Sequence, residues 1–211
     1  RQMCIRDRRI AVDVDDVLAE NAAGIVAFSN QRWGTNLTVD DYDEHWAKMW
    51  QVDNAEVERR TAEIVSTSLS AGYGHIGGAL EVLERLAQHH HLMIATSRCL
   101  QVKGDTIAWI DEHFPGIFAS TAVYFSGIWD ELTNDSHRAT KAELVVQINA
   151  DVLIDDQLKH CQAVAAHGRN ALLFGDYAWN QAATLPAGVV RCTNWHEVEV
   201  AIERLASDEP A

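Results

Sequence analysis

The chain has 211 residues, 47% of them hydrophobic, which is enough to bury a full core as one domain with an insertion. Its formal net charge of −14, from 31 acidic and 17 basic residues, argues against binding to a nucleic-acid polymer, which requires a basic surface. No apolar run approaches the ~18 residues of a membrane span, and four scattered cysteines without a C-x-x-C pair are typical of reduced thiols in a cytoplasmic protein.

The chain opens with a charged stretch and then an apolar run that meets three aspartates. Residues 1–8 lack the apolar core of a secretory signal, resemble a non-native leader, and are excluded from the predicted fold. Residues 10–12 are typical of a buried parallel strand. Asp13 and Asp15 would project to the same side of an extended backbone and repel each other unless a cation or a shared proton separates them. Taken alone, the stretch is also compatible with an acidic turn that ends a strand.

Residues 20–75 are predicted to be mostly helical and contain no convincing strand. Helices are expected over residues 21–33 and from residue 53 to about residue 68. This stretch is too long for a crossover between neighbouring strands, so we predict that it is an inserted helical cap. The core domain would then consist of residues 9–19 and 76–207.

From Gly78 onward, helices alternate with strands. The expected helices are residues 79–89, 104–113, 141–149 and 195–205. The expected strands are residues 92–95, 121–125, 151–156 with two carboxylates at its end, 171–174 and 189–191. Strands that alternate with helices of about 10 to 15 residues predict an α/β fold with a parallel sheet covered on both faces.

Functional side chains follow three of the predicted strands and open one helix. They are Asp13 and Asp15, then Thr96, Ser97 and Arg98, then Asp155 and Asp156, and finally Lys141 in the first turn of its helix. In open α/β sheets, ligands bind beyond the carboxyl ends of the strands, so we expect these groups to converge. Four carboxylates on one edge need a divalent cation, and an oxygen-only donor set suits Mg²⁺. A hydroxyl, a lysine and a helix N-terminus beside that cation indicate a phosphate site.

These residues resemble the haloacid dehalogenase-like (HAD) superfamily of phosphotransferases. The resemblance is carried by Asp13-Val14-Asp15, by the apolar run that ends in Thr96, by the lone Lys141 and by Asp155-Asp156. Within the superfamily, the chain is most similar to the 5′(3′)-deoxyribonucleotidase group. Residues 13–19, 95–97, 153–156, 173–174, 179–181 and 194–195 carry that similarity. The resemblance covers about residues 9–206 and implies a Rossmann-like three-layer α/β core with a small helical cap.

The resemblance also implies catalytic roles. Asp13 would attack phosphorus and form an aspartyl-phosphate. Asp15 would protonate the leaving oxygen and then activate the water that hydrolyses the intermediate. Thr96 and Lys141 would bind the phosphoryl oxygens, and Lys141 would offset the charge that develops there.

The same resemblance implies a set of Mg²⁺ ligands. Asp13 and the backbone carbonyl of Asp15 would bind the ion together with one residue of the last acidic pair. Asp156 is favoured as this direct ligand, and Asp155 would orient the surrounding groups.

Four residues bear on substrate recognition. Asp16 stands where the superfamily usually has glycine, either as a solvated loop residue or as an extra ligand. Arg98 replaces the proline that commonly follows Thr-Ser in the nucleotidases, either as a second phosphate clamp or as the partner of a surface acid. Asn21 occupies the position of an aromatic residue that helps to sandwich the base, and Trp46 lies near the position of the other, where it either stacks on substrate or packs in the cap. The implied substrate-binding residues are Thr96, Ser97, Arg98, Lys141, Asn21 and Trp46.

The resemblance implies a Mg²⁺-dependent phosphomonoesterase of the 5′-nucleotidase type, a hydrolase acting on (deoxy)nucleoside monophosphates. Another small phosphate ester, such as a sugar phosphate, is the alternative substrate. The expected partners are this substrate and a second copy of the chain, because the relatives are often dimers. Neither a nucleic-acid polymer nor a membrane is an expected partner. The order of the motifs and the inserted cap argue against a signalling receiver module. Nothing in the sequence supports an inactive, metal-binding relative, since each catalytic position of the resemblance has a residue that can carry out its role.

Overall fold

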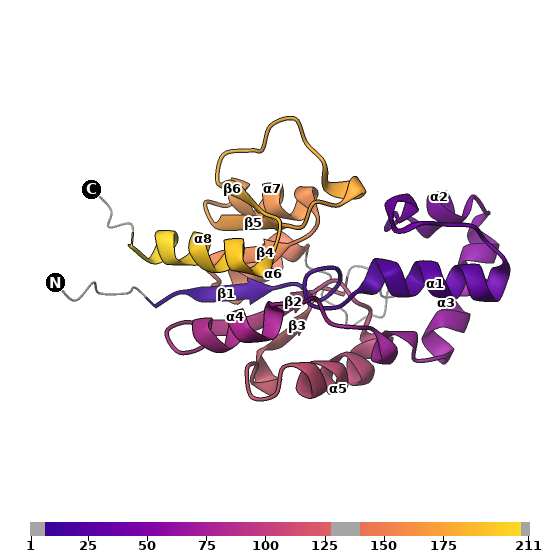
Figure 1. Cartoon of the computed structure of the whole chain (residues 1–211), viewed down its shortest axis with the longest axis horizontal. Helices are drawn as coiled ribbons and strands as arrows, with labels where there is room; N and C mark the ends of the chain where they lie inside the picture. The colour runs from indigo at the N-terminus through magenta and orange to yellow at the C-terminus, as the bar shows by residue number, and fades with distance from the viewer. Residues whose placement is uncertain (1–6, 128–139, 208–211) are drawn as a thin grey trace.

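The computed structural model describes residues 7–127 and 140–207, which form a layered α/β fold (Figure 1). Its centre is a six-stranded sheet in the order β3-β2-β1-β4-β5-β6, and every neighbouring pair is parallel. The strands are β1 (Arg9–Val12), β2 (His91–Thr96), β3 (Val123–Phe125), β4 (Val152–Asp155), β5 (Asn170–Phe174) and β6 (Val189–Cys192). The predicted α/β class with a parallel sheet is confirmed.

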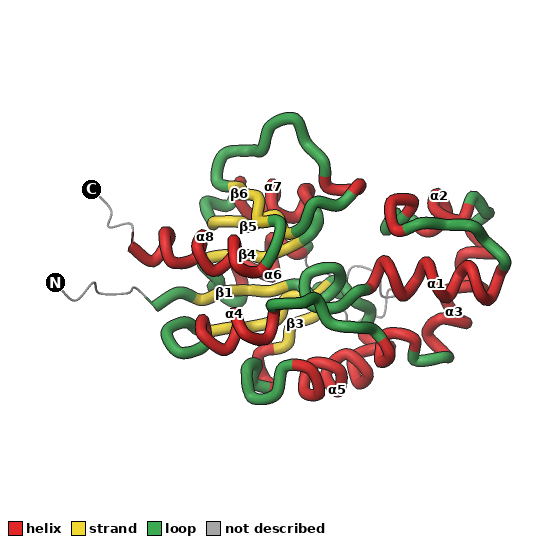
Figure 2. Tube along the Cα trace, viewed as in Figure 1, coloured by secondary structure: helices red, strands yellow, loops and turns green. Residues whose placement is uncertain are grey.

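Helices cover both faces of this sheet (Figure 2). Successive residues of a strand point to opposite faces, so in β1 the side chains of Ile10 and Val12 pack in one apolar layer and Ala11 in the other. The first layer is covered by α4 (Ala79–Leu86), α5 (Lys103–His113) and α8 (Trp195–Ser207), and the second by α6 (Lys141–Gln147) and α7 (Leu158–Ala166).

Helix α7 has no counterpart among the sequence-based expectations, which contain no helix between β4 and β5. Leu158, Cys161 and Val164 recur at helical spacing, and Cys161 and Val164 are fully buried against the sheet. The helix gives way to Gly168, whose φ of 72° lies in the left-handed region that favours glycine. These two signals indicate a helix in the sequence as well.

Three helices lie together beyond the carboxyl end of β1 (Figure 1): α1 (Asn21–Trp33), α2 (Trp46–Trp50) and α3 (Asn54–Ser66). Their packing centres on aromatic rings. The Trp50 ring lies 5.0 Å from that of Trp33 and 5.1 Å from that of Trp46, measured between centroids. The Arg60 guanidinium stands 4.6 Å from the centre of the Trp33 ring. We refer to these helices and the segments that join them as the cap.

The neck, residues 18–20 and 74–76, consists of the two chain segments that connect the cap with the sheet. These segments run antiparallel, with a bridge between Ala19 and His75. Two backbone hydrogen bonds flank the bridge, from Glu20 N to Gly74 O at 2.9 Å and from Ile76 N to Leu18 O at 2.7 Å. The predicted cap boundaries fall within the neck.

Arg8 takes part in the fold, although the sequence-based assignment places it in the excluded leader. Its carbonyl accepts a hydrogen bond from His91 N at 2.8 Å, which continues the pairing of β1 with β2, and its guanidinium donates to the Leu205 carbonyl. The exclusion is therefore wrong for Arg8. Residues 1–6 of that stretch lie outside the described part of the chain.

The described cysteines, Cys99, Cys161 and Cys192, are free thiols. None of the described helices combines the length and the apolar content that crossing a membrane requires.

Candidate active site

Polar side chains gather where the central strands of the sheet end. Strands β2, β1 and β4 are neighbours, and Asp13, Thr96 and Asp155 lie at or directly after their last residues. The backbone N–H of Asp13 donates to the Ile154 carbonyl at 2.9 Å, so β1 and β4 remain paired up to the aspartate. The predicted convergence at this edge of the sheet is therefore present for these three residues.

Lys141 joins β1 and β4 through their carboxylates. Its Nζ lies 2.7 Å from Asp13 Oδ2 and 2.7 Å from Asp155 Oδ2, and only 1% of its side chain is exposed. Asp13 and Asp155 follow Ala11 and Leu153 at two-residue spacing, on the sheet face that α6 covers. Because Lys141 is the first residue of α6, the three groups meet in the interior.

A capping box holds the start of α6, as the sequence predicts. Thr140 Oγ1 accepts a hydrogen bond from Glu143 N at 3.2 Å, and the Glu143 carboxylate accepts one from Thr140 N at 2.7 Å. The two bonds satisfy N–H groups that the first turn of a helix otherwise leaves free. Lys141 is thus attached to an anchored turn.

Asp13, Asp155 and Asp156 form a cluster of buried carboxylates. One oxygen from each lies within 4.8 Å of the others, which is close enough for the three to hold one metal ion. All the donors are oxygen atoms, and such donors suit a hard divalent cation such as Mg²⁺.

The two members of the terminal acidic pair differ in their hydrogen bonds. Both oxygens of Asp155 bind protein groups, namely Lys141, the backbone N–H of Gln157 at 2.8 Å and His160 Nδ1 at 3.3 Å. Asp156 Oδ2 accepts from Trp179 Nε1 at 2.7 Å and from Gln157 Nε2 at 2.8 Å. Its Oδ1 has no hydrogen-bond partner among the described residues, so Asp156 has an oxygen to offer a ligand.

The cluster carries more negative charge than its lysine offsets. Burial raises the pKa of Asp13 to about 7, with Lys141 opposing the rise and Asp155 adding to it. Burial also raises the pKa of Asp156 well above its usual range, and the Asp155 charge adds to the effect. Burial alone would raise the pKa of Asp155 as well, but Lys141 and His160 outweigh it and hold that pKa below its usual range. Asp13 and Asp156 therefore need a proton or a cation.

The end of β2 supplies three further groups. Thr96 is fully buried, and its Oγ1 accepts a hydrogen bond from Arg98 N at 3.1 Å. The Ser97 Oγ is buried and has no partner among the described residues. The Arg98 guanidinium forms an ion pair with Asp15, with 2.7 Å between Nη2 and Oδ1. Neither sequence-based alternative for Arg98 names this partner.

Asp16 is 4% exposed, so its interpretation as a solvated loop residue is wrong. Its φ of 56° lies in the left-handed region, which aspartate tolerates better than most residues other than glycine. Its Oδ1 accepts from Ala22 N at 2.9 Å and its Oδ2 from Asn21 Nδ2 at 3.3 Å, in the first turn of α1. Burial raises the pKa of Asp16 to about 7, and the bond from Ala22 opposes the rise.

Three aromatic rings stand beside the carboxylates: Tyr42 of the cap, and Tyr177 and Trp179 of the loop after β5. The Trp179 ring stacks on Tyr177 with centroids 4.5 Å apart and meets Tyr42 edge-on at 5.1 Å. The Tyr42 hydroxyl accepts a hydrogen bond from Asn21 Nδ2 at 2.9 Å. Tyr42 and Trp179 also line a hollow of about 420 Å³ between the cap and the core.

The two residues predicted to lie at the base-binding positions have different surroundings. Asn21 is buried and links Asp16 to Tyr42. Trp46 packs against Trp50 inside the cap. Tyr42 is the cap residue whose ring meets Trp179.

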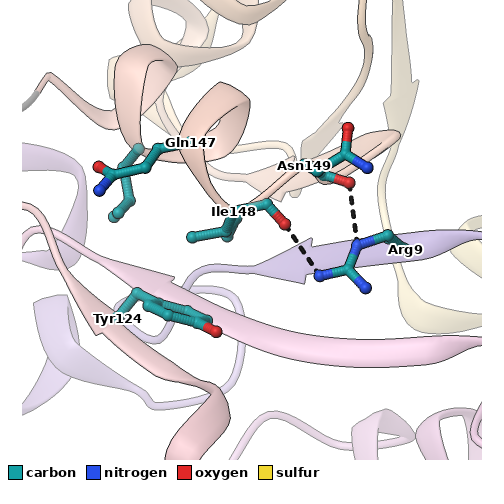
Figure 3. Close-up of a pocket in the computed structure, with 6 residues that line it drawn as sticks. Arg9, Tyr124, Gln147, Ile148 and Asn149 are labelled. Atoms are coloured by element: carbon teal, nitrogen blue, oxygen red, sulfur yellow. Dashed lines mark hydrogen bonds between the residues drawn. The ribbon is translucent and has the colours of Figure 1, made fainter.

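Another hollow, of about 470 Å³, is lined by residues of β1, of β3 and of the C-terminal part of α6 and the turn after it (Figure 3). Its lining residues are Arg9, Tyr124, Leu144, Gln147, Ile148 and Asn149. The Arg9 guanidinium donates to the carbonyls of Ile148 at 2.9 Å and Asn149 at 3.0 Å, which satisfies carbonyl groups at the end of α6. Arg9 begins β1, whereas the carboxylates follow its end. The ionisable groups converge beyond the carboxyl ends of the strands and not at this hollow.

A family model described as "5′ nucleotidase, deoxy (Pyrimidine), cytosolic type C protein" matches residues 7–207. The chain belongs to this family. A comparison with curated protein sequences gives no match.

Solved structures share the fold of this nucleotidase-family chain at low sequence identity. A predicted phosphatase from Clostridium acetobutylicum has a TM-score of 0.67 at 15% identity, over 94% of this chain and 99% of that chain. A haloacid dehalogenase-like family hydrolase from Streptococcus pneumoniae has a TM-score of 0.66 at 12% identity, over 92% and 98%. A HAD family hydrolase from Deinococcus radiodurans R1, solved with bound phosphate and sodium, has a TM-score of 0.64 at 17% identity, over 98% and 100%. The predicted HAD phosphatase, a hydrolase, is confirmed.

Among the residues of the nucleotidase-family site that have no predicted role are His160 and Trp179. His160 lies in the first turns of α7 and binds Asp155, and Trp179 binds Asp156. The contact of His160 has a signal in the sequence, because this polar residue lies in the first turn of a helix that directly follows the carboxylate at the end of a strand. Trp179 belongs to a segment that carries the nucleotidase resemblance, but the pattern does not show that its indole reaches Asp156.

Proposed function

We propose that this chain is a Mg²⁺-dependent phosphomonoesterase that hydrolyses (deoxy)nucleoside monophosphates through an aspartyl-phosphate on Asp13. The observation that carries the proposal is the buried set of Asp13, Lys141 and Asp155 with Asp156 beside it. This set combines a nucleophile, a cation for the phosphoryl oxygens and donors for a metal ion.

The donor set fits Mg²⁺. Asp13, the backbone carbonyl of Asp15 and Asp156 would hold the ion. One oxygen of Asp156 has no partner among the described residues, which supports this residue as the direct ligand. Both oxygens of Asp155, in contrast, contact protein groups that include Lys141 and His160. The raised pKa values of Asp13 and Asp156 are those of buried carboxylates whose charge the single lysine does not fully offset. When bound, the ion supplies positive charge that polarises the phosphoryl group.

The residues of the chain would act in two steps. In the first, an Asp13 oxygen bonds to phosphorus while the bond to the nucleoside oxygen breaks, and Asp15 gives that oxygen a proton. In the second, Asp15 takes a proton from the water that attacks phosphorus, and phosphate leaves Asp13. Thr96 and Lys141 would donate hydrogen bonds to the phosphoryl oxygens throughout, and a fixed buried ammonium is well suited to stabilise the developing charge.

The nucleoside part of the proposal is supported by the aromatic wall and by the family. Tyr42 and Trp179 line the hollow between the cap and the core, and base stacking on such rings is worth about 1–3 kcal/mol. The family's description names a deoxy (pyrimidine) 5′ nucleotidase. Ser97, whose hydroxyl has no described partner, remains a proposed substrate ligand, and Asn21 would hold Tyr42 in place.

We also infer a cytoplasmic location, which the cytosolic family description and the free thiols support. A homodimer, implied by the HAD nucleotidase resemblance, stays a prediction that light scattering would check.

The proposal is tested with a panel of phosphate esters in the presence of Mg²⁺. Deoxynucleoside monophosphates should give the highest kcat/KM, because sugar phosphates cannot stack on Tyr42 and Trp179. EDTA should abolish turnover and excess Mg²⁺ should restore it. Asp13→Asn should abolish turnover of an aryl phosphate without changing the far-UV circular dichroism, since it removes the nucleophile and a metal ligand.

Turnover by Asp13→Asn would refute the aspartyl-phosphate mechanism, and activity that ignores EDTA would refute the metal site. A preference for sugar phosphates would keep the phosphatase and overturn the nucleotide assignment.

A further inference from the structure

Arg98 donates more hydrogen bonds to one oxygen of the Asp15 carboxylate than to the other. Nη2 donates to Oδ1 at 2.7 Å and Nε donates to the same oxygen at 3.0 Å. Among the described residues, the other carboxylate oxygen, Oδ2, accepts a hydrogen bond from Nε alone, at 3.2 Å. Oδ1 is therefore the anchored oxygen, and Oδ2 is the one left to exchange a proton.

The arginine is itself held from three sides. Its backbone N–H donates to Thr96 Oγ1 at 3.1 Å, its Nη1 donates to Thr106 Oγ1 of α5 at 3.2 Å, and its guanidinium lies 5.8 Å from the centre of the Tyr73 ring. The Arg98 side chain is 6% exposed and that of Asp15 is 28% exposed. A fixed, buried guanidinium thus faces a carboxylate that is open to the site, so the ion pair restrains Asp15 more than Arg98.

We infer that Arg98 is a positioning residue that orients Asp15 for proton transfer to the leaving oxygen. This inference rests on the proposed function, in which Asp15 is the general acid. The proton passes from Asp15 Oδ2 to the leaving oxygen as the phosphorus–oxygen bond to it breaks and the bond to Asp13 forms. Oδ1 keeps its two hydrogen bonds from Arg98 during this transfer, because the planar guanidinium presents both donors in a rigid fork.

A phosphate clamp and a positioning residue have different consequences for the choice of substrate. A residue that binds the phosphoryl group contributes to the transfer of every phosphate ester alike. A residue that orients the acid contributes only where the leaving oxygen needs a proton. Dinitrophenolate leaves without one, whereas phenolate, like the oxygen of a nucleoside, does not leave readily.

The test compares 2,4-dinitrophenyl phosphate with phenyl phosphate, using kcat/KM, which reports events up to the first phosphoryl transfer. Arg98→Met should lower kcat/KM by about 10²-fold for phenyl phosphate, the lower range for general acid catalysis, and only a few-fold for the dinitrophenyl ester. Arg98→Lys keeps the positive charge but lacks the two paired donors of the guanidinium. Its kcat/KM should also fall more for phenyl phosphate than for the dinitrophenyl ester, but by a smaller factor than in Arg98→Met. Arg60→Met, which removes a mostly buried arginine of the cap, should not change the ratio of the two substrates.

Asp15→Asn separates failure of the inference from failure of the proposed function. It should lose phenyl phosphate hydrolysis selectively, as Arg98→Met does. If Asp15→Asn keeps phenyl phosphate activity, the acid role of Asp15 falls and the inference with it. If Asp15→Asn shows the selective loss but the Arg98 variants lose both substrates equally, only the inference is overturned. If Arg98→Met does not fold, two other variants provide the test: Arg98→Lys, and Thr106→Val, which removes a hydrogen-bond acceptor of the guanidinium. The measurement is again the ratio of kcat/KM for phenyl phosphate to kcat/KM for the dinitrophenyl ester.

Discussion

At the scale of single residues, Trp179 connects the two halves of the site. Its indole N–H donates to Asp156 Oδ2 at 2.7 Å, while its ring stacks on Tyr177 and meets Tyr42 of the cap. One side chain therefore orients a proposed metal ligand and forms part of the wall of the hollow proposed to hold the base.

We expect Trp179→Phe to weaken Mg²⁺ binding while preserving most of the ring contact. The Mg²⁺ concentration for half-maximal activity should rise by about 10-fold or more, because the loss of a hydrogen bond behind a metal ligand costs roughly 10–100-fold in affinity. The measurement is a Mg²⁺ titration of the EDTA-treated enzyme with an aryl phosphate, which carries no nucleobase. Trp46→Phe, a matched change inside the cap, should leave the titration as it is. An unaltered midpoint in Trp179→Phe would contradict this role.

At the scale of secondary structure, the first turn of α6 fixes the lysine. Thr140→Ala removes the hydroxyl that accepts from Glu143 N, so the free energy of unfolding should fall by about 1 kcal/mol in urea denaturation. Activity should fall a few-fold as well, since Lys141 is the next residue. Thr140→Ser retains the hydroxyl and should retain both properties. Full activity in Thr140→Ala would show that packing alone positions Lys141.

The elements of the core other than α7 are predicted from local patterns, because each of them has an apolar run or period and an end signal. The same patterns place Asp13, Thr96 and Asp155, since strand ends of a parallel sheet share one edge. The partners of Asp15 and Asp156 could not be predicted, because Arg98 and Trp179 reach them from other strands and loops.

The burial of Asp16 was also out of reach of the sequence pattern. It depends on the loop after β5, where the Tyr177 hydroxyl donates to the Asp16 carbonyl at 2.9 Å, and on the first turn of α1. A run of aspartates contains no local sign of which one will be enclosed. Solvation is the ordinary outcome for a charged loop residue, and here tertiary contacts reverse it.

At the scale of the whole molecule, buried carboxylates make stability depend on pH. Burial raises the pKa of both Asp13 and Asp16 to about 7, whereas an aspartate in an unfolded chain titrates near 3.9. Between these values the folded state holds more protons than the unfolded state, so the free energy of unfolding falls as pH rises and levels off above about 7. The lowered pKa of Asp155 adds stability that is already complete above about pH 5.

We therefore expect the Tm of the metal-free protein to be lower at about pH 8 than at about pH 5.5. Mg²⁺ should raise Tm more at the higher pH, because it binds ionised carboxylates. Asp16→Asn removes a carboxyl group whose pKa is raised and which lies outside the proposed set of metal ligands. This variant should therefore show a weaker dependence of Tm on pH. Differential scanning fluorimetry in EDTA and in Mg²⁺ measures all three. A Tm that rises over this range in EDTA would contradict the expectation.

The neck has a consequence for engineering this family. Because its two segments are hydrogen-bonded side by side at Ala19 and His75, the chain leaves the core and returns to it at almost the same place. A cap from another protein needs only two junctions there, and its own ends must simply lie as close together as paired strands do. The core would keep the proposed phosphoryl-transfer residues Asp13, Thr96, Lys141 and Asp155, together with Trp179, so chimeras of this kind would exchange only the cap's share of the proposed substrate recognition.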